Sequence, residues 1–219
     1  MPGLRDVRAV MKWRAERRNM RRLWGDAGRG LVAPPPRAFA AFGTGSILMP
    51  PVRVQGPEHI SIGDGVTIHE HAWLLVVALP DMPLPRLAIG SGTSINRFFK
   101  VVCAGSVEIE DDVLIGDQVA IADTHYRYDA PDTPILKQPL AAPMPVRIGR
   151  GTHIGVRVTI MPGVTIGENA YVGAAAVVRD DVPPRTVIAG DPARPIRRYD
   201  EATGTWVDVR SMPGAAGAV

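Results

Sequence analysis

Aliphatic residues recur every six positions through much of the chain after residue 60, and several are followed directly by glycine. The pattern amounts to 13 hexads, of which 11 carry Val, Thr or Ala four residues after the aliphatic position. The longest uninterrupted register runs through Ile148, Ile154, Ile160, Ile166, Val172 and Val178. Neither an α-helix nor an ordinary strand has a period of six residues. The pattern therefore predicts a repeat architecture.

A unit of six residues is too short to bury a core alone, so successive units must stack and share one. The aliphatic residue of each hexad can point inward, and the small residue four positions later can fill a corner. Glycine beside the aliphatic position suits a tight turn in which a Cβ atom would clash. Three flat sides per coil give a triangular prism of parallel strands. We therefore expect an all-β domain over residues 37–198.

Interruptions of the hexad register indicate where the chain leaves the regular coil. The register breaks at residues 74–89, 101–109 and 122–147. The second break implies a two-residue bulge near Ala104. The third contains five prolines and predicts a loop extruded from the coil, with His125 at its root. Insertions into a regular scaffold tend to carry function, so we expect the chemistry to lie here.

Three runs of sequence carry a resemblance to a known family. They are residues 121–126 at the root of the loop, residues 154–167 in the later hexads, and residues 187–194, which read Val-Ile-Ala-Gly-Asp-Pro-Ala-Arg. Together they resemble the hexapeptide-repeat acyltransferases, which include maltose and galactoside O-acetyltransferases and lipopolysaccharide and capsule sugar O-acetyltransferases. The resemblance covers about residues 60–200. It implies a left-handed parallel β-helix and a homotrimer whose active sites lie between adjacent prisms.

The resemblance also implies a reaction, the transfer of an acyl group from CoA to a hydroxyl of a sugar or glycan. In that family a histidine before such a loop is the catalytic base, which is the role implied for His125. A neutral imidazole can take the proton that a hydroxyl loses as it attacks a thioester. Asp123 or Asp129 could hold the other ring nitrogen and fix the tautomer. The residues that we expect to contact the acceptor are Asn96, Tyr126 and Gln138.

Acyl-CoA, with acetyl-CoA as the expected form, needs room for its pantetheine arm and cations for its phosphates. Small residues of the last coils can give the room, namely Gly155, Gly173, Ala174 and Ala175. Arginines near the end of the coil can bind phosphate, namely Arg179, Arg185, Arg194 and Arg197. His153 stands where the relatives usually have tryptophan, so a stacking role does not carry over to it.

Two other functions are compatible with such a coil. A γ-type carbonic anhydrase binds a metal through three histidines, but the later coils hold only His125 and His153, which are 28 residues apart. We therefore expect no metal. A non-catalytic binding scaffold that uses a basic N-terminus is the second alternative.

Charge is concentrated near the N-terminus. The whole chain has a formal charge of +3, which argues against a nucleic-acid partner. Residues 1–30 alone carry nine Lys or Arg against three acidic residues. The sequence predicts an N-terminal segment over residues 1–36. It consists of a basic helix over residues 1–30, indicated by the helical spacing of apolar residues, and a break of three consecutive prolines. This segment could contact an anionic membrane or cap the coil.

The remaining features concern the compartment and the C-terminus. A single cysteine, Cys103, excludes an internal disulfide and favours a reducing compartment. No apolar run approaches the length of a membrane span. We expect a cytoplasmic protein, with peripheral contact to the inner membrane face as a further alternative. Residues 199–219 are expected to form a C-terminal extension with a flexible end.

Overall fold

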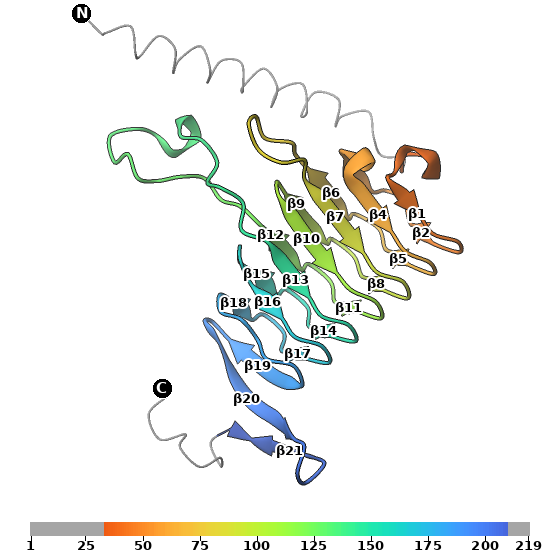
Figure 1. Ribbon diagram of the computed structural model, residues 1–219, viewed down its shortest axis with the longest axis vertical. Helices are drawn as coiled ribbons and strands as arrows, with labels where there is room; N and C mark the ends of the chain where they lie inside the picture. The colour runs from red at the N-terminus through yellow and green to blue at the C-terminus, as the bar shows by residue number, and fades with distance from the viewer. Residues whose placement is uncertain (1–32, 210–219) are drawn as a thin grey trace, which may run out of the picture.

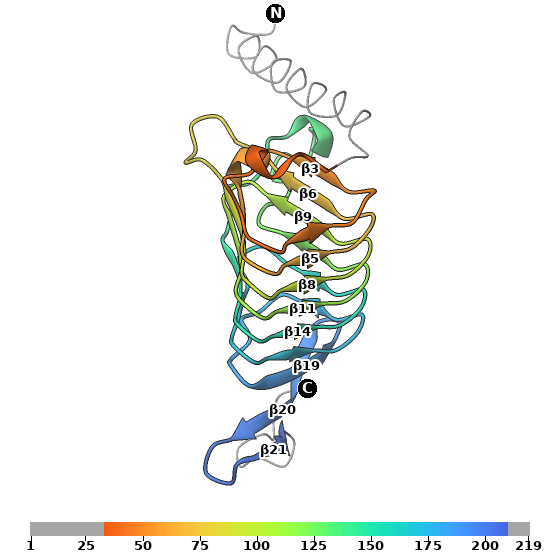
Figure 2. The ribbon, with the colours of Figure 1, turned by 90° about the vertical axis from the view of Figure 1, so that its right-hand side faces the viewer.

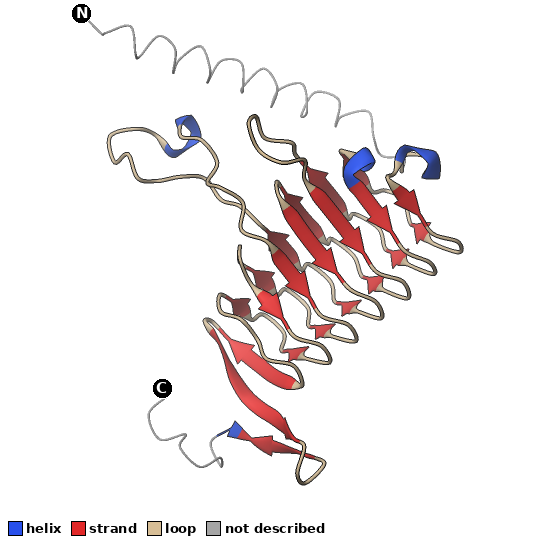
Figure 3. Ribbon diagram, in the orientation of Figure 1, coloured by secondary structure: helices blue, strands red, loops and turns tan. Residues whose placement is uncertain are grey.

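The structure is a computed structural model that describes residues 33–209. Within this range the chain winds into a stack of coils, and each coil contributes one short strand to each of three sheets (Figure 1). Figure 2 shows the coils from a second side, stacked one upon the next. Helical structure among the described residues consists of short 3-10 turns (Figure 3), chiefly Pro36–Ala38 (η2), Pro57–His59 (η3) and Ile135–Lys137 (η4). The all-β prediction is confirmed.

The three sheets, named A, B and C, form the three sides of the prism, and within the coil every pairing is parallel. Sheet A contains β1 (Ala41–Phe42), β4 (Ile60–Ile62), β7 (Arg86–Ile89), β10 (Ser106–Ile109), β13 (Val146–Ile148) and β16 (Thr165–Ile166). Sheet B contains β2 (Ile47–Leu48), β5 (Thr67–Ile68), β8 (Ser94–Ile95), β11 (Leu114–Ile115), β14 (His153–Ile154), β17 (Tyr171–Val172) and β19 (Thr186–Gly190). Sheet C contains β3 (Arg53–Gln55), β6 (Trp73–Val76), β9 (Lys100–Cys103), β12 (Ala120–Ala122), β15 (Thr159–Ile160) and β18 (Val177–Val178).

The hexad register becomes the core of the prism. In the last coils, hydrogen-bonded partners are three hexads apart, so Ile148 pairs with Ile166 and Ile160 with Val178. The aliphatic positions are buried in one continuous cluster. Each adds its apolar surface to that of the residues above and below it, which is why a six-residue unit is stable only in a stack.

The corners are filled as the hexads predict, and they also accommodate Phe99, which stands in one of the two hexads that lack Val, Thr or Ala at this position. Small residues such as Val119 and Ala176 are fully buried there. Phe99 occupies the same kind of position and is also fully buried. Thr93 and Thr152 satisfy their buried hydroxyls by donating to the carbonyls of Glu110 and Gly167, both at 3.0 Å.

All three predicted breaks lie at the corner where the chain passes from sheet C to sheet A. Residues 77–85 connect β6 to β7, and residues 123–145 connect β12 to β13. The second connection runs out to one side of the prism and carries η4 (Figure 1). The predicted bulge at Ala104 is confirmed, because β9 and β10 are separated by two residues and Val101 pairs with Ile121, 20 positions away.

Beyond the last coil the chain forms an antiparallel extension that the hexad pattern does not predict. β19 pairs with β20 (Ala193–Asp200), and β20 pairs with β21 (Thr205–Asp208). The predicted domain end at residue 198 therefore falls inside β20. The predicted basic helix over residues 1–30 and the predicted flexible end after residue 209 lie outside the described residues. The left-handed sense of the coil stays a prediction of the resemblance.

Candidate active site

His125 lies at the start of the protruding connection, three residues after β12 ends, and its side chain is exposed. Its backbone carbonyl accepts the N–H of Ala141 at 2.8 Å, and the backbone N–H of Arg127 donates to Pro139 at 3.0 Å. A bridge between Tyr126 and Leu140 completes a short antiparallel ladder. The main chain on which His125 sits is therefore fixed at the root of an otherwise irregular loop.

Asp123 anchors this root to the neighbouring coil. Its side chain has no exposed surface. Its carboxylate accepts the N–H groups of Ala104 at 2.8 Å and Gly105 at 2.7 Å, and its carbonyl accepts the N–H of Met144 at 2.7 Å. A buried carboxylate needs such donors, since an unpaired one would be costly. The carboxylate oxygens thus serve the turn, and no bond from Asp123 to the His125 ring is present.

The thiol of Cys103 lies in the same buried region and donates to the carbonyl of Arg86 at 3.3 Å. Burial, together with the charge of Asp123, raises the pKa of this thiol from 9.0 to about 12. The thiol is therefore protonated at neutral pH, and a protonated thiol is a poor nucleophile. Burial and protonation together exclude Cys103 as the nucleophile of an acyl transfer.

The other loop residues predicted to take part serve different contacts. Asp129 is exposed and forms an ion pair with Arg127, which lowers the pKa of the carboxyl group. Gln138 is buried, and its amide bonds the carbonyls of Ala130 and Thr133 at 3.1 and 2.8 Å. Gln138 thereby organises the tip of the loop. Tyr126 is 39% exposed and remains available to an acceptor.

Asn96 and His125 lie at opposite edges of sheet C. β9 pairs with β12 through Lys100 with Ala120 and Val102 with Ala122. Asn96 precedes β9 by four residues, at the corner between sheets B and C, whereas His125 follows β12 at the corner between sheets C and A. One chain therefore does not bring these two predicted site residues together.

The small residues predicted for the donor do come together. Gly155 and Gly173, with Ala174 and Ala175 beside the latter, occupy the corner between sheets B and C in the last coils. Close approach explains the glycine at 155, because a Cβ atom there would lie 2.7 Å from the nitrogen of Ala174. Ala174 and Ala175 are exposed, so the turn that follows β17 presents a surface without bulky side chains.

The four predicted arginines are distributed over different corners, and three have acidic partners. Arg179 lies 3.3 Å from Asp191, and Arg194 lies 2.9 Å from Asp180. Arg185 pairs with Glu201 and lies 4.0 Å from Glu168. Arg197 on β20 forms no ion pair with any described residue. Arg197 is therefore the predicted cation with a guanidinium available to a phosphate.

His153 stands in register with Tyr171 on sheet B, and their rings stack with centroids 4.6 Å apart. Burial lowers the pKa of His153. No group of three metal-ligating side chains is found among residues 33–209. That part of the chain also has no helix long and apolar enough to cross a membrane.

Sequence comparison finds relatives among transferases. A family model described as bacterial transferase hexapeptide (six repeats) matches residues 145–180. The galactoside O-acetyltransferase of Escherichia coli (strain K12) is 33% identical over 141 residues, which cover 62% of this chain and 64% of that protein. The matches span 42% to 64% of the length of three curated relatives.

Solved structures agree in fold. A galactoside acetyltransferase in complex with coenzyme A is similar at a TM-score of 0.53 and 28% identity, with 75% of this chain and 67% of that chain covered. AntD, an N-acyltransferase from Bacillus cereus in complex with dTDP and 3-hydroxybutyryl-CoA, reaches a TM-score of 0.64 at 20% identity, covering 76% and 87%. The latter likeness shows the fold alone.

Proposed function

Because the chain belongs to the hexapeptide-repeat acyltransferase family, we propose that it moves an acyl group from acyl-CoA to a hydroxyl of a sugar or glycan. Acetyl-CoA is the proposed donor. The observation that carries the proposal is the placement of His125, exposed on a fixed main chain at the root of the loop between β12 and β13. This is where the family resemblance puts a general base.

In the proposed reaction, His125 accepts the proton of the acceptor hydroxyl as its oxygen attacks the thioester carbon. The C–S bond then breaks, and the sulfur of CoA leaves with the proton that the His125 imidazolium gives back. General-base assistance of this kind contributes roughly 10²–10⁴ to the rate. Neither Asp123 nor Asp129 holds the His125 ring within the described chain. We therefore propose that the ring is oriented by the bound acceptor or by a second copy of the chain.

The positions of Asn96 and His125 support a homotrimer. If both residues contact one acceptor, they must come from different copies, because one chain places them at opposite edges of sheet C. Exposed apolar side chains on sheet B, such as Ile47 and Tyr171, are further surface that association would cover. Peripheral contact of residues 1–30 with an anionic membrane remains a proposal about a segment outside the described residues.

Release of free thiol from acetyl-CoA, measured against a panel of sugars and amino sugars, tests the activity. Mild hydroxylamine then cleaves an ester product and leaves an amide intact, which distinguishes transfer to oxygen from transfer to nitrogen. The proposal expects thiol release with at least one sugar and a hydroxylamine-sensitive product. Release with amino sugars alone would assign the chain to N-acyl transfer, and release with no acceptor would contradict the proposed activity.

A further inference from the structure

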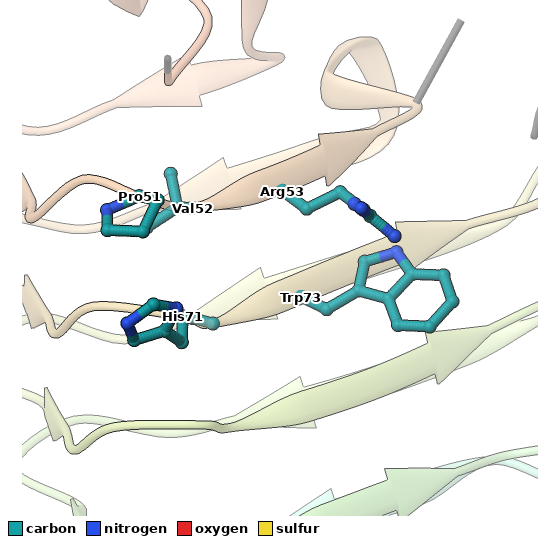
Figure 4. A pocket seen from close by; sticks show the side chains of 6 residues that line it. Pro51, Val52, Arg53, His71 and Trp73 are labelled. Atoms are coloured by element: carbon teal, nitrogen blue, oxygen red, sulfur yellow. The ribbon is translucent and has the colours of Figure 1, made fainter. Parts of the chain in front are cut away.

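A hollow of about 190 Å³ lies at the corner between sheets B and C, at the opposite end of the coil from the small residues proposed for CoA. Figure 4 shows the side chains that surround it, with the Arg53 guanidinium close to the Trp73 indole. Its lining comes from the starts of β3 and β6 and the turns before them: Pro51, Val52, Arg53, His71, Ala72 and Trp73.

Two cations are held beside this hollow by one aromatic ring. Arg53, Trp73 and Lys100 are in register on β3, β6 and β9. The guanidinium carbon of Arg53 lies 5.4 Å from the Trp73 ring centroid, and the ammonium of Lys100 lies 4.8 Å from it. Such cation–π contacts fix the positions of the charges without neutralising them.

These two charges are not balanced by a carboxylate of the described chain. Among residues 33–209, neither Arg53 nor Lys100 forms an ion pair. The acidic residue that adjoins the hollow in sequence is Glu70, whose carboxylate lies 3.8 Å from Nδ1 of His69. Two like charges on rungs about 10 Å apart, given a strand spacing of about 4.8 Å, repel each other. An anion bound beside the Trp73 ring, near both cations, would relieve that repulsion.

The hollow is also connected to the proposed acceptor site. The His71 ring stacks on the Phe98 ring with centroids 4.8 Å apart and an interplanar angle of 5°. Phe98 follows Asn96 by two residues at the same corner of the next coil. A ligand that reaches Asn96 thus lies one coil from Trp73 and two coils from Arg53. By contrast, Gly155 precedes β15, three rungs from β6, or about 14 Å.

We propose that this hollow binds a phosphoryl group carried by the acceptor, so that the substrate is a phosphate-bearing sugar or glycan. Arginine and lysine are the side chains that bind phosphate oxygens best, and here they are positioned in advance. The assignment of the phosphoryl group to the acceptor rests on the proposed acyl transfer. The binding of an anion in the hollow depends only on the charges of Arg53 and Lys100.

The test is calorimetric titration of the full chain with inorganic pyrophosphate at low salt. The Arg53→Ala/Lys100→Ala variant should bind at least tenfold more weakly. The matched control is Arg147→Ala/Arg150→Ala, which removes the same charge from residues paired with Glu110 and Asp112 on the side of sheet A. It should bind as the unmodified protein does. Equal binding by both variants, or no binding by the unmodified protein, would overturn the proposal.

Competition and turnover identify the source of the phosphate. Saturating CoA should leave pyrophosphate binding unchanged, and displacement by CoA would assign the hollow to the donor and overturn its assignment to the acceptor. In the thiol-release assay, Arg53→Ala/Lys100→Ala should raise KM for a sugar phosphate at least tenfold without changing KM for acetyl-CoA. If no acceptor supports thiol release, acyl transfer fails, whereas the titration still decides whether the hollow binds phosphate.

Discussion

The carboxylate of Asp123 accepts the backbone N–H of Gly105 at 2.7 Å, across 18 positions of sequence. This bond joins the first residue of the protruding loop to the turn of the coil beneath it. Pro143, in the segment of the loop that returns to β13, leaves no room for a side chain at Gly105. A Cβ atom on Gly105 would lie 2.6 Å from the Cβ atom of Pro143. The turn and the two ends of the loop are therefore one packed unit.

Asp123→Asn should destabilise the fold and lower turnover. The carboxamide would present its NH₂ group to at least one of two N–H donors, so one buried hydrogen bond to a charged group is lost, at a cost of about 2–3 kcal/mol. Urea unfolding measures this loss. Asp129→Asn changes an exposed carboxyl of the same loop and should leave the unfolding midpoint within experimental error. Equal stability of Asp123→Asn and the unmodified chain would contradict the anchoring role.

Stability should depend on the protonation of His153. Burial lowers the pKa of His153 in the folded chain, so the unfolded chain binds a proton more readily. The associated stability is present above the ordinary value of 6.5 and is lost as the pH falls through and below it. Replacing His153 with Phe keeps a ring against Tyr171 and should flatten the pH dependence of the unfolding midpoint between about pH 7 and about pH 5.

The control for this effect is Tyr171→Phe, which keeps His153 and the ring stacked on it. That variant should keep the pH dependence of the unmodified chain. If His153→Phe and the unmodified chain lose stability in parallel on acidification, another group is responsible.

Coenzyme A should bind through Arg197 more than through the other arginines near the end of the coil. Arg194 is paired with Asp180, so replacing that carboxylate with a phosphate of CoA gains little binding free energy. Arg197 forms no ion pair with a described residue. Arg197→Ala should weaken CoA about tenfold, in line with a lost charge-assisted bond, and should weaken dephospho-CoA less. Arg194→Ala serves as the comparison. Equal weakening of both ligands by Arg197→Ala would place this guanidinium away from the 3′-phosphate.

Repetition is what made the coil predictable from sequence. Each hexad makes the same contacts as its neighbours, so the register from Ile148 to Val178 and the bulge at Ala104 follow from spacing alone. The antiparallel extension of β20 and β21 has no repeat, and none of the residues in its two strands is fully buried. Its pairing depends on where the last coil ends.

Side-chain partners were less predictable than positions. Asp123 is one of two carboxylates that the sequence offers for the His125 ring, yet its partners are amides 18 and 19 positions earlier. These amides become neighbours only when two coils stack. A similar case is the column of Arg53, Trp73 and Lys100 on adjacent strands. The sequence intervals within it are unequal because the loop of residues 77–85 lies between Trp73 and Lys100. Insertions shift the spacing, so short-range patterns do not reveal such columns.

Turnover of His125→Ala with acetyl-CoA and an accepted sugar tests the account most directly. The variant removes an exposed ring that makes no hydrogen bond within the described chain, so its unfolding midpoint and its affinity for CoA should stay those of the unmodified protein. If His125 is the general base, kcat should fall by roughly 10²–10⁴. A kcat near that of the unmodified protein would contradict the assignment of His125 and, with it, the mechanism proposed for this site.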